Sequence, residues 1–531
     1  MKVNRYLRVF CAVALTLALV ISFIGFTSSP ASSAPSRSKT VTLASSQNPR
    51  TLDPHNWNDV GTETTLKMMW ESLIYTDRTG SGEYIPMLAE SWDIAPDGMS
   101  WTFYLRRGVF WQNGDPFNAD DVVYSFNRVD ERRNELVYLI QYLASYDSVE
   151  KLDEYTVKLN FKEPTPMAGN GLRAFYVIPK NAHEEFGDDL FSLQMCPGTG
   201  PWKIVEWVTG SHSQFVKNEN YWNKANFDSY FDEVFIRYVT DSNAGVMGHL
   251  AGDIDVYAPS GGINVDLLPM YAGTENRIEL IQQETTQSSW ITFQFKDNSI
   301  WNDFNVRRAF SMAIDRQLII DALLGGAGNI PRGYFFRGVI GYDPTLEPYE
   351  YNPELARQLL AASAYDGRYL EIMANPNLMR AEDVLLAISD MVNSVGFNIG
   401  IRIVETTVFN ERRANSDFDL FGMQASFIDG IPHRQYNLIL NDTDNTNFVD
   451  EEINELVREF NREMSVARRA EIAVAVNRLL TEKLAPHVLL AHYVNTYARN
   501  YGIVCGQGRS LFYPDGTFNF AYADWDPSRL P

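Results

Sequence analysis

The stretch from Tyr84 to Val129 constrains the fold of this chain more than any other part of the sequence. Within it Trp101, Phe103 and Leu105 alternate with more polar residues, which is the period of a strand buried on one face. The dipeptide Asp97-Gly98 precedes this run and favours a tight turn, because glycine readily adopts the positive φ that such turns need. We therefore expect strands in the first part of the stretch.

A helix is expected after these strands. Asn118 can cap its amino end, and Asp120 and Asp121 place carboxylates beside the exposed N–H groups of the first turn. Val122 and Phe126 then follow at helical spacing and would bury one face. The whole stretch predicts two or three strands closed by a capped helix.

The same stretch resembles a known family. Its motifs P-x-LAESW, DG-x-x-WTF-x-LR-x-GV-x-W and NGDPF-x-ADDVVYSF are similar to those of the family 5 extracellular solute-binding proteins, the oligopeptide-, dipeptide- and nickel-type receptors of ABC importers. The alternative is an unrelated β-rich enzyme with similar turns. The length and order of the match favour the family.

The resemblance implies an α/β fold: a two-lobed periplasmic binding protein of the class II type, with mixed sheets flanked by helices and an extra satellite domain. With 531 residues the chain is long enough for two or three domains. We expect a signal peptide in 1–34, a first lobe in 35–75, 196–288 and 488–531, a satellite domain in 76–195, and a second, ligand-binding lobe in 289–487.

Local sequence signals also support mixed α/β structure outside the stretch from Tyr84 to Val129, which we call the organising stretch. A helix is expected through Thr64–Ser72, and another is expected to start after a cap at Asn352. Residues 366–410 alternate between strand and helix, with a helix over 381–395 stopped by Gly396. This βαβ rhythm predicts a mixed sheet flanked by helices.

The amino terminus has the layout of a secretory signal peptide. Lys2, Arg5 and Arg8 precede an uncharged apolar run over 9–26, and the small residues TSSPASSA follow. We therefore expect a periplasmic protein. The run is long enough that an uncleaved membrane anchor is the alternative.

Charge and motifs restrict the possible partners. The formal net charge of −22 disfavours nucleic-acid binding. The sequence has no GxSxG, HExxH or P-loop, so we name no catalytic residue and expect no enzyme. Seven histidines without a clustered pair predict no metal site, and no cofactor is expected. The expected partners are a small solute and the permease and ATPase subunits of an ABC importer, and we expect a monomer.

Two cysteines, Cys196 and Cys505, remain after the leader. The resemblance places both in the first lobe, and an oxidising compartment favours their pairing. We predict a Cys196–Cys505 disulfide, with two buried thiols as the alternative.

The resemblance also points to a first cleft segment. TLDPH (Thr51–His55) matches the family closely, and the loop after it lines the ligand site in peptide-binding members. The predicted ligand-binding residues here are Trp57, Asn58, Asp59 and Val60. A plain surface loop is the alternative.

The second cleft segment is expected within Phe418–His433. Peptide-binding relatives carry a Trp-x-x-Asp there, whose carboxylate binds the α-amino group of the ligand. This chain departs from that pattern, with Ala425 and Ile428 at the two positions and Asp429 one residue further on. The predicted contacts of this segment are Gln424, Ala425, Ser426, Phe427, Ile428 and Asp429.

Three further residues are candidates for the ligand site. Trp290 and Gln294 lie near the expected start of the second lobe. Arg380 stands where some relatives hold an anionic group, and the planar guanidinium suits a carboxylate. The alternative for Arg380 is an exposed residue at a helix start.

The function that these observations favour is capture of a peptide or peptide-like solute for import. A secreted hydrolase is an alternative from another class, because carboxylate pairs are not excluded by motif searches. A sensory receptor, or a receptor for a sugar, opine or chelate, would use the same fold. The departure from Trp-x-x-Asp favours the interpretation that the ligand is not an ordinary peptide.

Overall fold

The computed structural model describes most of the chain after the leader. Its described residues from 40 onward belong to one unit. The described residues are 39–76, 84–136, 139, 145–192, 197–337, 339–376, 380–426, 436, 442, 445–484, 486–506, 511–512 and 518–529.

One long mixed sheet organises the described residues. Its strands follow the order β15-β14-β16-β12-β17-β11-β1-β10-β9-β8, and β13 pairs with β17 off this path. The strands are β1 (Thr40–Ser45), β8 (Trp202–Val208), β9 (His212–Lys217), β10 (Glu233–Tyr238), β11 (Val256–Tyr257), β12 (Ile278–Phe293), β13 (Gly328–Asn329), β14 (Leu370–Ala374), β15 (Ile399–Ile403), β16 (Leu420–Ser426) and β17 (His487–Asn500).

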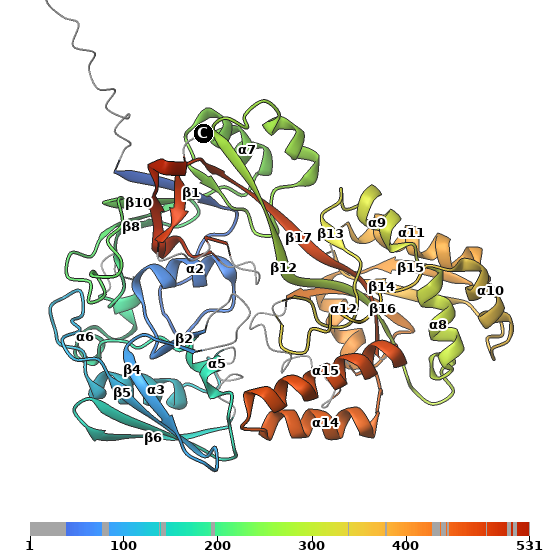
Figure 1. Ribbon diagram of the computed structural model, residues 1–531, viewed down its shortest axis with the longest axis horizontal. Helices are drawn as coiled ribbons and strands as arrows, with labels where there is room; N and C mark the ends of the chain where they lie inside the picture. Colours follow the sequence, from blue (N-terminus) through green and yellow to red (C-terminus); the bar gives the residue numbers. More distant parts are fainter. Residues whose placement is uncertain are drawn as a thin grey trace, which may run out of the picture. The chain divides into compact units, whose positions relative to one another are not determined.

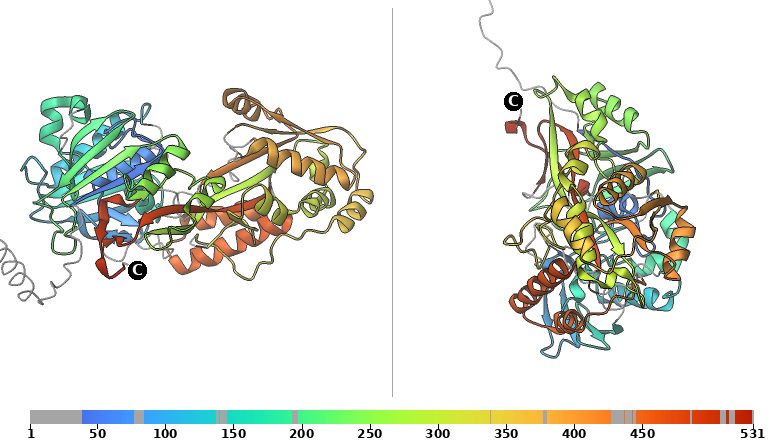
Figure 2. Two further views of the ribbon diagram at one scale, coloured as in Figure 1. Left: turned by 90° about the horizontal axis from the view of Figure 1, so that it is seen from above. Right: turned by 90° about the vertical axis from the view of Figure 1, so that its right-hand side faces the viewer.

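Two of these strands, β12 and β17, link the two lobes. They pair antiparallel from Ile278 opposite Asn500 to Thr292 opposite His487, and they run side by side between the two groups of elements (Figure 1). The left view of Figure 2 shows β17 passing between the same two groups. The expected domain boundaries at 288 and 488 fall inside this strand pair, and they stay predictions.

The organising stretch forms the strands and helix that its sequence predicts. In β5 the side chains of Trp101 and Phe103 are fully buried, whereas Tyr104 is exposed. Asn118 caps α3 by accepting the N–H of Asp120 at 2.8 Å. The elements of this region are β2 (Ile74–Thr76), β3 (Tyr84–Pro86), β4 (Ala89–Ile94), β5 (Ser100–Leu105), α3 (Ala119–Glu131), β6 (Tyr146–Asp153), β7 (Thr156–Phe161), α5 (Ala168–Leu172) and α6 (Lys180–Phe186).

The helix expected over Thr64–Ser72 lies earlier in the chain, at α2 (Val60–Met69). It starts before Thr64 because the Asp59 carboxylate accepts the N–H of Thr62 at 2.8 Å and caps the first turn. It ends at Met69 because Trp70 adopts an extended conformation. The predicted bounds were therefore wrong by a few residues at each end.

Two glycines explain the PGTGPW motif that follows the satellite region. The N–H of Gly200 donates to the carbonyl of Met69 at 2.7 Å, so the motif packs on the end of α2. A Cβ atom on Gly198 would lie 2.0 Å from that carbonyl oxygen. Only glycine allows the two backbones to approach so closely.

The second lobe contains the predicted βαβ unit. Strands β14 and β15 are parallel, and the helix between them is followed by Gly396 at a φ of 117°. Asn352 caps its helix by accepting the N–H of Leu355 at 3.1 Å. The helices of this lobe are α8 (Phe304–Ala313), α9 (Arg316–Ala322), α10 (Pro353–Ala361), α11 (Ala381–Ser394), α12 (Thr406–Ala414), α14 (Glu451–Arg462) and α15 (Val466–Lys483).

The hydrophobic core is divided between the lobes. One cluster joins the first lobe to the satellite strands and includes both Val41 and Phe103. A second cluster surrounds Phe310 and α11, and a third lies under α14 and α15 around Val476. The remaining α-helix and strands of the described residues, α7 (Ser242–Ala251), β18 (Ile503–Cys505) and β19 (Ala523–Trp525), lie on the side of the first lobe. No helix in the described part of the chain is both long and apolar enough to span a bilayer.

Candidate functional site

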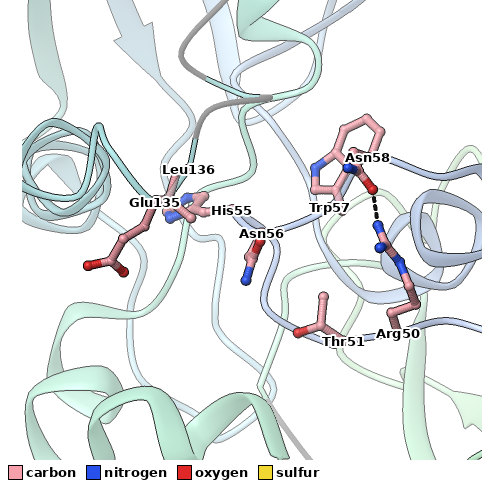
Figure 3. Close-up of a pocket in the computed structure, with 8 residues that line it drawn as sticks. All are labelled: Arg50, Thr51, His55, Asn56, Trp57, Asn58, Glu135 and Leu136. Carbon is pink, nitrogen blue, oxygen red and sulfur yellow. Dashed lines mark hydrogen bonds between the residues drawn. The ribbon is translucent and has the colours of Figure 1, made fainter. Parts of the chain in front are cut away.

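The loop before α2 borders a cavity of about 270 Å³ (Figure 3). The loop contributes most of the lining, and the residues after α3 contribute the opposite side. The lining residues are Arg50, Thr51, His55, Asn56, Trp57, Asn58, Glu135 and Leu136.

Hydrogen bonds fix the protonation of the histidine in this cavity. A guanidinium only donates, so Nδ1 of His55 accepts from Nη1 of Arg128 at 2.8 Å. Its Nε2 therefore carries the proton and donates to the carbonyl of Tyr176 at 2.8 Å. Burial, together with the nearby Arg128 charge, lowers the pKa of His55 to about 4. His55 is neutral at physiological pH and fixed in orientation.

The charged groups of the cavity already have partners. Arg50 donates to the Asp59 carboxylate at 2.9 Å and also contacts Asn58. Glu135 accepts from Nε of Arg132 at 2.9 Å. The cavity therefore offers mainly neutral groups, amides and a hydroxyl beside the Trp57 indole, for hydrogen bonding and apolar contact.

Of the four residues predicted in this loop, two line the cavity and two form the cap and the first residue of α2. Trp57 and Asn58 line the cavity, and the Trp57 indole is buried 6.5 Å from the ring of Tyr176. Asp59 is occupied as the cap of α2, and Val60 begins that helix. The sequence argument missed His55 and Arg50, although both lie within or beside the TLDPH motif.

Trp290 and Gln294 lie on β12 inside the second lobe. Trp290 packs 5.3 Å from the His487 ring and is 4% exposed. Gln294 is 1% exposed and donates to the carbonyl of Asn445 at 3.0 Å. Their burial reduces the area that either side chain could offer to a solute.

The predicted contacts of the second segment begin on β16. Gln424 lies opposite Ser289 in the antiparallel ladder with β12, and Ala425 and Ser426 continue that ladder. The amide of Gln424 donates to Gln287 at 3.5 Å. The predicted contacts Phe427, Ile428 and Asp429 lie outside the described residues, so their part in the site stays a prediction.

Arg380 stands directly before α11. Its guanidinium contacts Asp383 at 3.2 Å and donates to the carbonyl of Leu323 at 3.0 Å. Its backbone has a φ of 50°, in the left-handed region. The structure thus places Arg380 at a helix start with local partners.

The predicted disulfide is not described in full, because Cys196 lies outside the described residues. Cys505 is buried on β18, and its Sγ atom lies 3.5 Å from Nδ2 of Asn519. The Cys196–Cys505 bond stays a prediction. Across the described residues, no group of three or more His, Cys, Asp or Glu side chains is arranged to hold a metal ion.

The two lobes also meet at a point away from the linking strands. A Cβ atom on Gly98, in the satellite turn, would lie 3.1 Å from the sulfur of Met464 between α14 and α15. Met167 of the satellite region packs against the third hydrophobic cluster. The second lobe therefore contacts the first-lobe side through the linker and through the satellite strands.

Two lobes connected by a pair of long strands define a class of ligand-binding protein. The solved structure of HbpA2 from Haemophilus parasuis has the same fold, with a TM-score of 0.81 and 23% identity over 92% of this chain and 100% of that one. Residues 83–447 match the family model described as bacterial extracellular solute-binding proteins, family 5 Middle. The chain belongs to this family.

Its relatives are named for different solutes. A Brucella ovis protein named for ABC-transporter peptide binding is 28% identical over 358 residues, which cover 65% of each chain. Heme-binding protein A of Haemophilus influenzae is 29% identical over 344 residues, 58% of this chain and 60% of that protein. The chain thus matches just under two thirds of the length of these curated relatives. The family consists of solute-binding proteins, which are not enzymes.

Proposed function

We propose that this chain is the periplasmic substrate-binding protein of an ABC importer and that it captures a peptide or peptide-like solute between its lobes. The observation that carries this proposal is the β12–β17 pair, which links two separately packed lobes. Lobes joined in this way close on a ligand by a hinge movement. Peptide binding is the function for which the Brucella relative is named.

The loop of Trp57 and Asn58 supplies the first-lobe wall of the proposed site. It is rigid, because Asp59 caps α2 and His55 is held by Arg128 and Tyr176. A rigid wall lowers the ordering cost of binding. The second-lobe wall is assigned to Gln424–Asp429, as the family resemblance implies.

The proposed partners follow from the family. The closed, liganded form is recognised by the permease and ATPase subunits, and the protein works as a monomer after removal of the 1–34 signal peptide. The proposed domains are the first lobe (35–75, 196–288 and 488–531), the satellite domain (76–195) and the second lobe (289–487).

Native mass spectrometry of protein purified from its own periplasm tests this proposal. We expect an added mass that corresponds to a peptide or peptide-like solute and that is released unchanged on denaturation. Asn58 lines the cavity, so Asn58→Ala should weaken retention of that solute. Asn415 is exposed and follows α12, so Asn415→Ala should not change the retention. A solute released in cleaved form would favour a hydrolase, and identical scattering profiles with and without a tight ligand would contradict closure.

A further inference from the structure

The satellite region is fixed firmly to the first lobe. Phe103 of the satellite strands belongs to the same hydrophobic cluster as Val41 of the first lobe. Arg128 on α3 donates to the two carboxylate oxygens of Asp53 at 3.1 and 2.8 Å, and both side chains are buried. Separating a buried ion pair is strongly destabilising, so the satellite and the first lobe form one rigid body.

A second contact joins this body to the second lobe. On the satellite side it consists of the turn at Gly98 and the start of α5, and on the other side of the connection between α14 and α15. A Cβ atom on Gly98 would lie 3.1 Å from Sδ of Met464. Met167, directly before α5, packs against the hydrophobic cluster under α14 and α15. Figure 1 shows α5 beside α15, below the linking strands.

Hydrogen bonds and ring packing fix the satellite side of this contact. Nε1 of Trp101 donates to the carbonyl of Thr165 at 3.2 Å, and the N–H of Thr165 donates to the carbonyl of Gly98 at 3.0 Å. The Tyr84 ring lies 5.8 Å from the Trp101 ring. It also packs on α5, since a Cβ atom on Gly169 would lie 2.5 Å from it. The satellite surface is therefore preformed.

Arg469, in the first turn of α15, fixes the side of the second lobe. Its Nη1 atom donates to the carbonyl of Glu463 at 2.7 Å and to the carbonyl of Met464 at 3.4 Å, which closes the turn between the two helices. Burial lowers the pKa of Arg469, while Tyr84 of the satellite and Glu463 oppose this shift. The guanidinium thus lies at the junction, close enough to Tyr84 for an electrostatic interaction.

The contact combines a favourable and an unfavourable part, which makes it reversible. Methionine side chains adapt to an opposing surface and gain from apolar burial, although Met464 remains 37% exposed. Arg469 is only 7% exposed, and its Nε atom is buried without an acceptor among the described residues. Water would hydrate that N–H if the two sides separated. The contact is therefore weaker than the attachment of the satellite to the first lobe.

We propose that Met464, Met167 and Arg469 form a latch that stabilises the closed arrangement of the lobes and slows release of the solute. None of the three lines the cavity of Trp57 and Asn58, so they act as positioning residues. The second lobe can swing about β12 and β17 only after the latch separates, because the satellite belongs to the first-lobe body. This inference rests on the proposed function, since it requires lobes that open and close around a solute.

The test uses the full-length mature protein, both as purified from the periplasm and after removal of its solute by urea and dialysis. Native mass spectrometry measures how fast the co-purified solute is lost after dilution, and small-angle X-ray scattering measures opening. Met464→Glu places a charge in the contact. We expect it to release the solute roughly tenfold faster and to increase the radius of gyration, because one partly buried methionine contact is lost.

Met270→Glu is the matched control. Met270 is 38% exposed and lies in the segment Val265–Tyr271, beside α7 on the side of the first lobe. It should match the wild type in both measurements. Met464→Ala adds no charge, should act in the same direction as Met464→Glu, and replaces it if the charged variant does not fold. The urea midpoints of the Met464 variants should stay near the wild-type value, which separates opening from unfolding.

Three results would overturn the inference. If the wild type opens on removal of its solute but both Met464 variants match it in release rate and scattering, the latch is wrong and the proposed function stands. If the wild type carries a solute and its scattering does not change on removal, the latch and lobe closure are both wrong. If the wild type carries no solute, equal radii of gyration of Met464→Glu and the wild type exclude the latch.

Discussion

Arg128 holds Asp53 in a buried, two-pronged ion pair, with Nη1 3.1 Å and Nη2 2.8 Å from the two carboxylate oxygens. Arg128 lies on α3 of the satellite region, whereas Asp53 belongs to the loop that borders the first cavity. The same guanidinium donates to His55 and to Asp188. Burial raises the pKa of Asp188, but its hydrogen bonds with Arg128 and His183 and the nearby arginine charges lower that pKa to about 2. One side chain thus fixes the cavity loop to α3 of the satellite region.

Removing this guanidinium should destabilise the protein strongly. Arg128→Met leaves the Asp53 carboxylate buried without its partner, and such a change costs about 3–5 kcal/mol in the free energy of unfolding. Urea unfolding measures the loss. The double variant Arg128→Met/Asp53→Leu should lose less than the sum of the two single variants, because no buried charge is left alone. The exposed Arg468→Met, which removes a surface ion pair with Glu459, should leave the free energy of unfolding nearly unchanged, because water screens such pairs.

The sequence predicted those helices and strands whose positions depend on interactions between residues close together in the chain. The Asn118 cap, the alternation of Trp101 and Phe103, and the stop at Gly396 each depend on neighbours within a few residues. The family motifs then supplied the order of the lobes. The start of α2 at Val60, directly after the Asp59 cap, follows from the same capping rule, and the sequence analysis missed it.

The candidate sites depend on long-range geometry that a single sequence does not contain. His55 and Arg128 are 73 positions apart, and nothing in either neighbourhood indicates their contact. A further cavity, bordered by Glu284 and His492, forms because β12 and β17 pair across more than 200 positions with a shifted register. Burial has the same origin: nothing near Trp290 or Gln294 in the sequence indicates that both side chains are buried. Their place in the ligand site stays a prediction.

Gly198 should tolerate no side chain. Gly198→Ala would place Cβ 2.0 Å from the carbonyl oxygen of Met69, and backbone has to move to relieve this contact. We expect a loss of about 3 kcal/mol or more in the free energy of unfolding, measured by urea denaturation. Gly328→Ala is the matched control, since its nearest neighbour would be 3.4 Å away, and it should change stability by about 1 kcal/mol or less. Equal losses in the two variants would contradict the close approach at Met69.

Arg316 should not be replaceable by lysine. Its buried guanidinium donates to the carbonyl of Leu489 at 2.8 Å and to the carbonyl and hydroxyl of Ser311 at 3.0 Å each. It thereby ties the end of α8 to β17. A lysine ammonium does not reproduce this planar fork, so Arg316→Lys should cost about 2–4 kcal/mol. Thermal unfolding compares it with Arg357→Lys on the exposed face of α10, for which a change within about 0.5 kcal/mol is expected.

His249 should make the stability of the protein fall with acid. It is fully buried and contacts the Tyr271 hydroxyl at 3.2 Å. Burial lowers its pKa from 6.5 to about 4, although Asp255 opposes the shift. Between pH 6.5 and 4 the unfolded chain therefore binds a proton that the folded protein does not. The His249 contribution is fully present above pH 6.5 and is lost as the pH falls through this window, by about 3 kcal/mol at most.

Replacement of this histidine isolates the effect. His249→Gln removes the titrating group, so its stability deficit relative to the wild type should be largest near pH 7 and should shrink towards pH 4.5. Urea unfolding of both proteins at these two pH values measures the difference. Glu71 works in the opposite direction, because burial raises its pKa to about 7, and its contribution falls as the pH rises from 4.5 to 7. Since Glu71 is present in both proteins, it cancels in the comparison, and a deficit that does not change with pH would show that His249 does not titrate in this window.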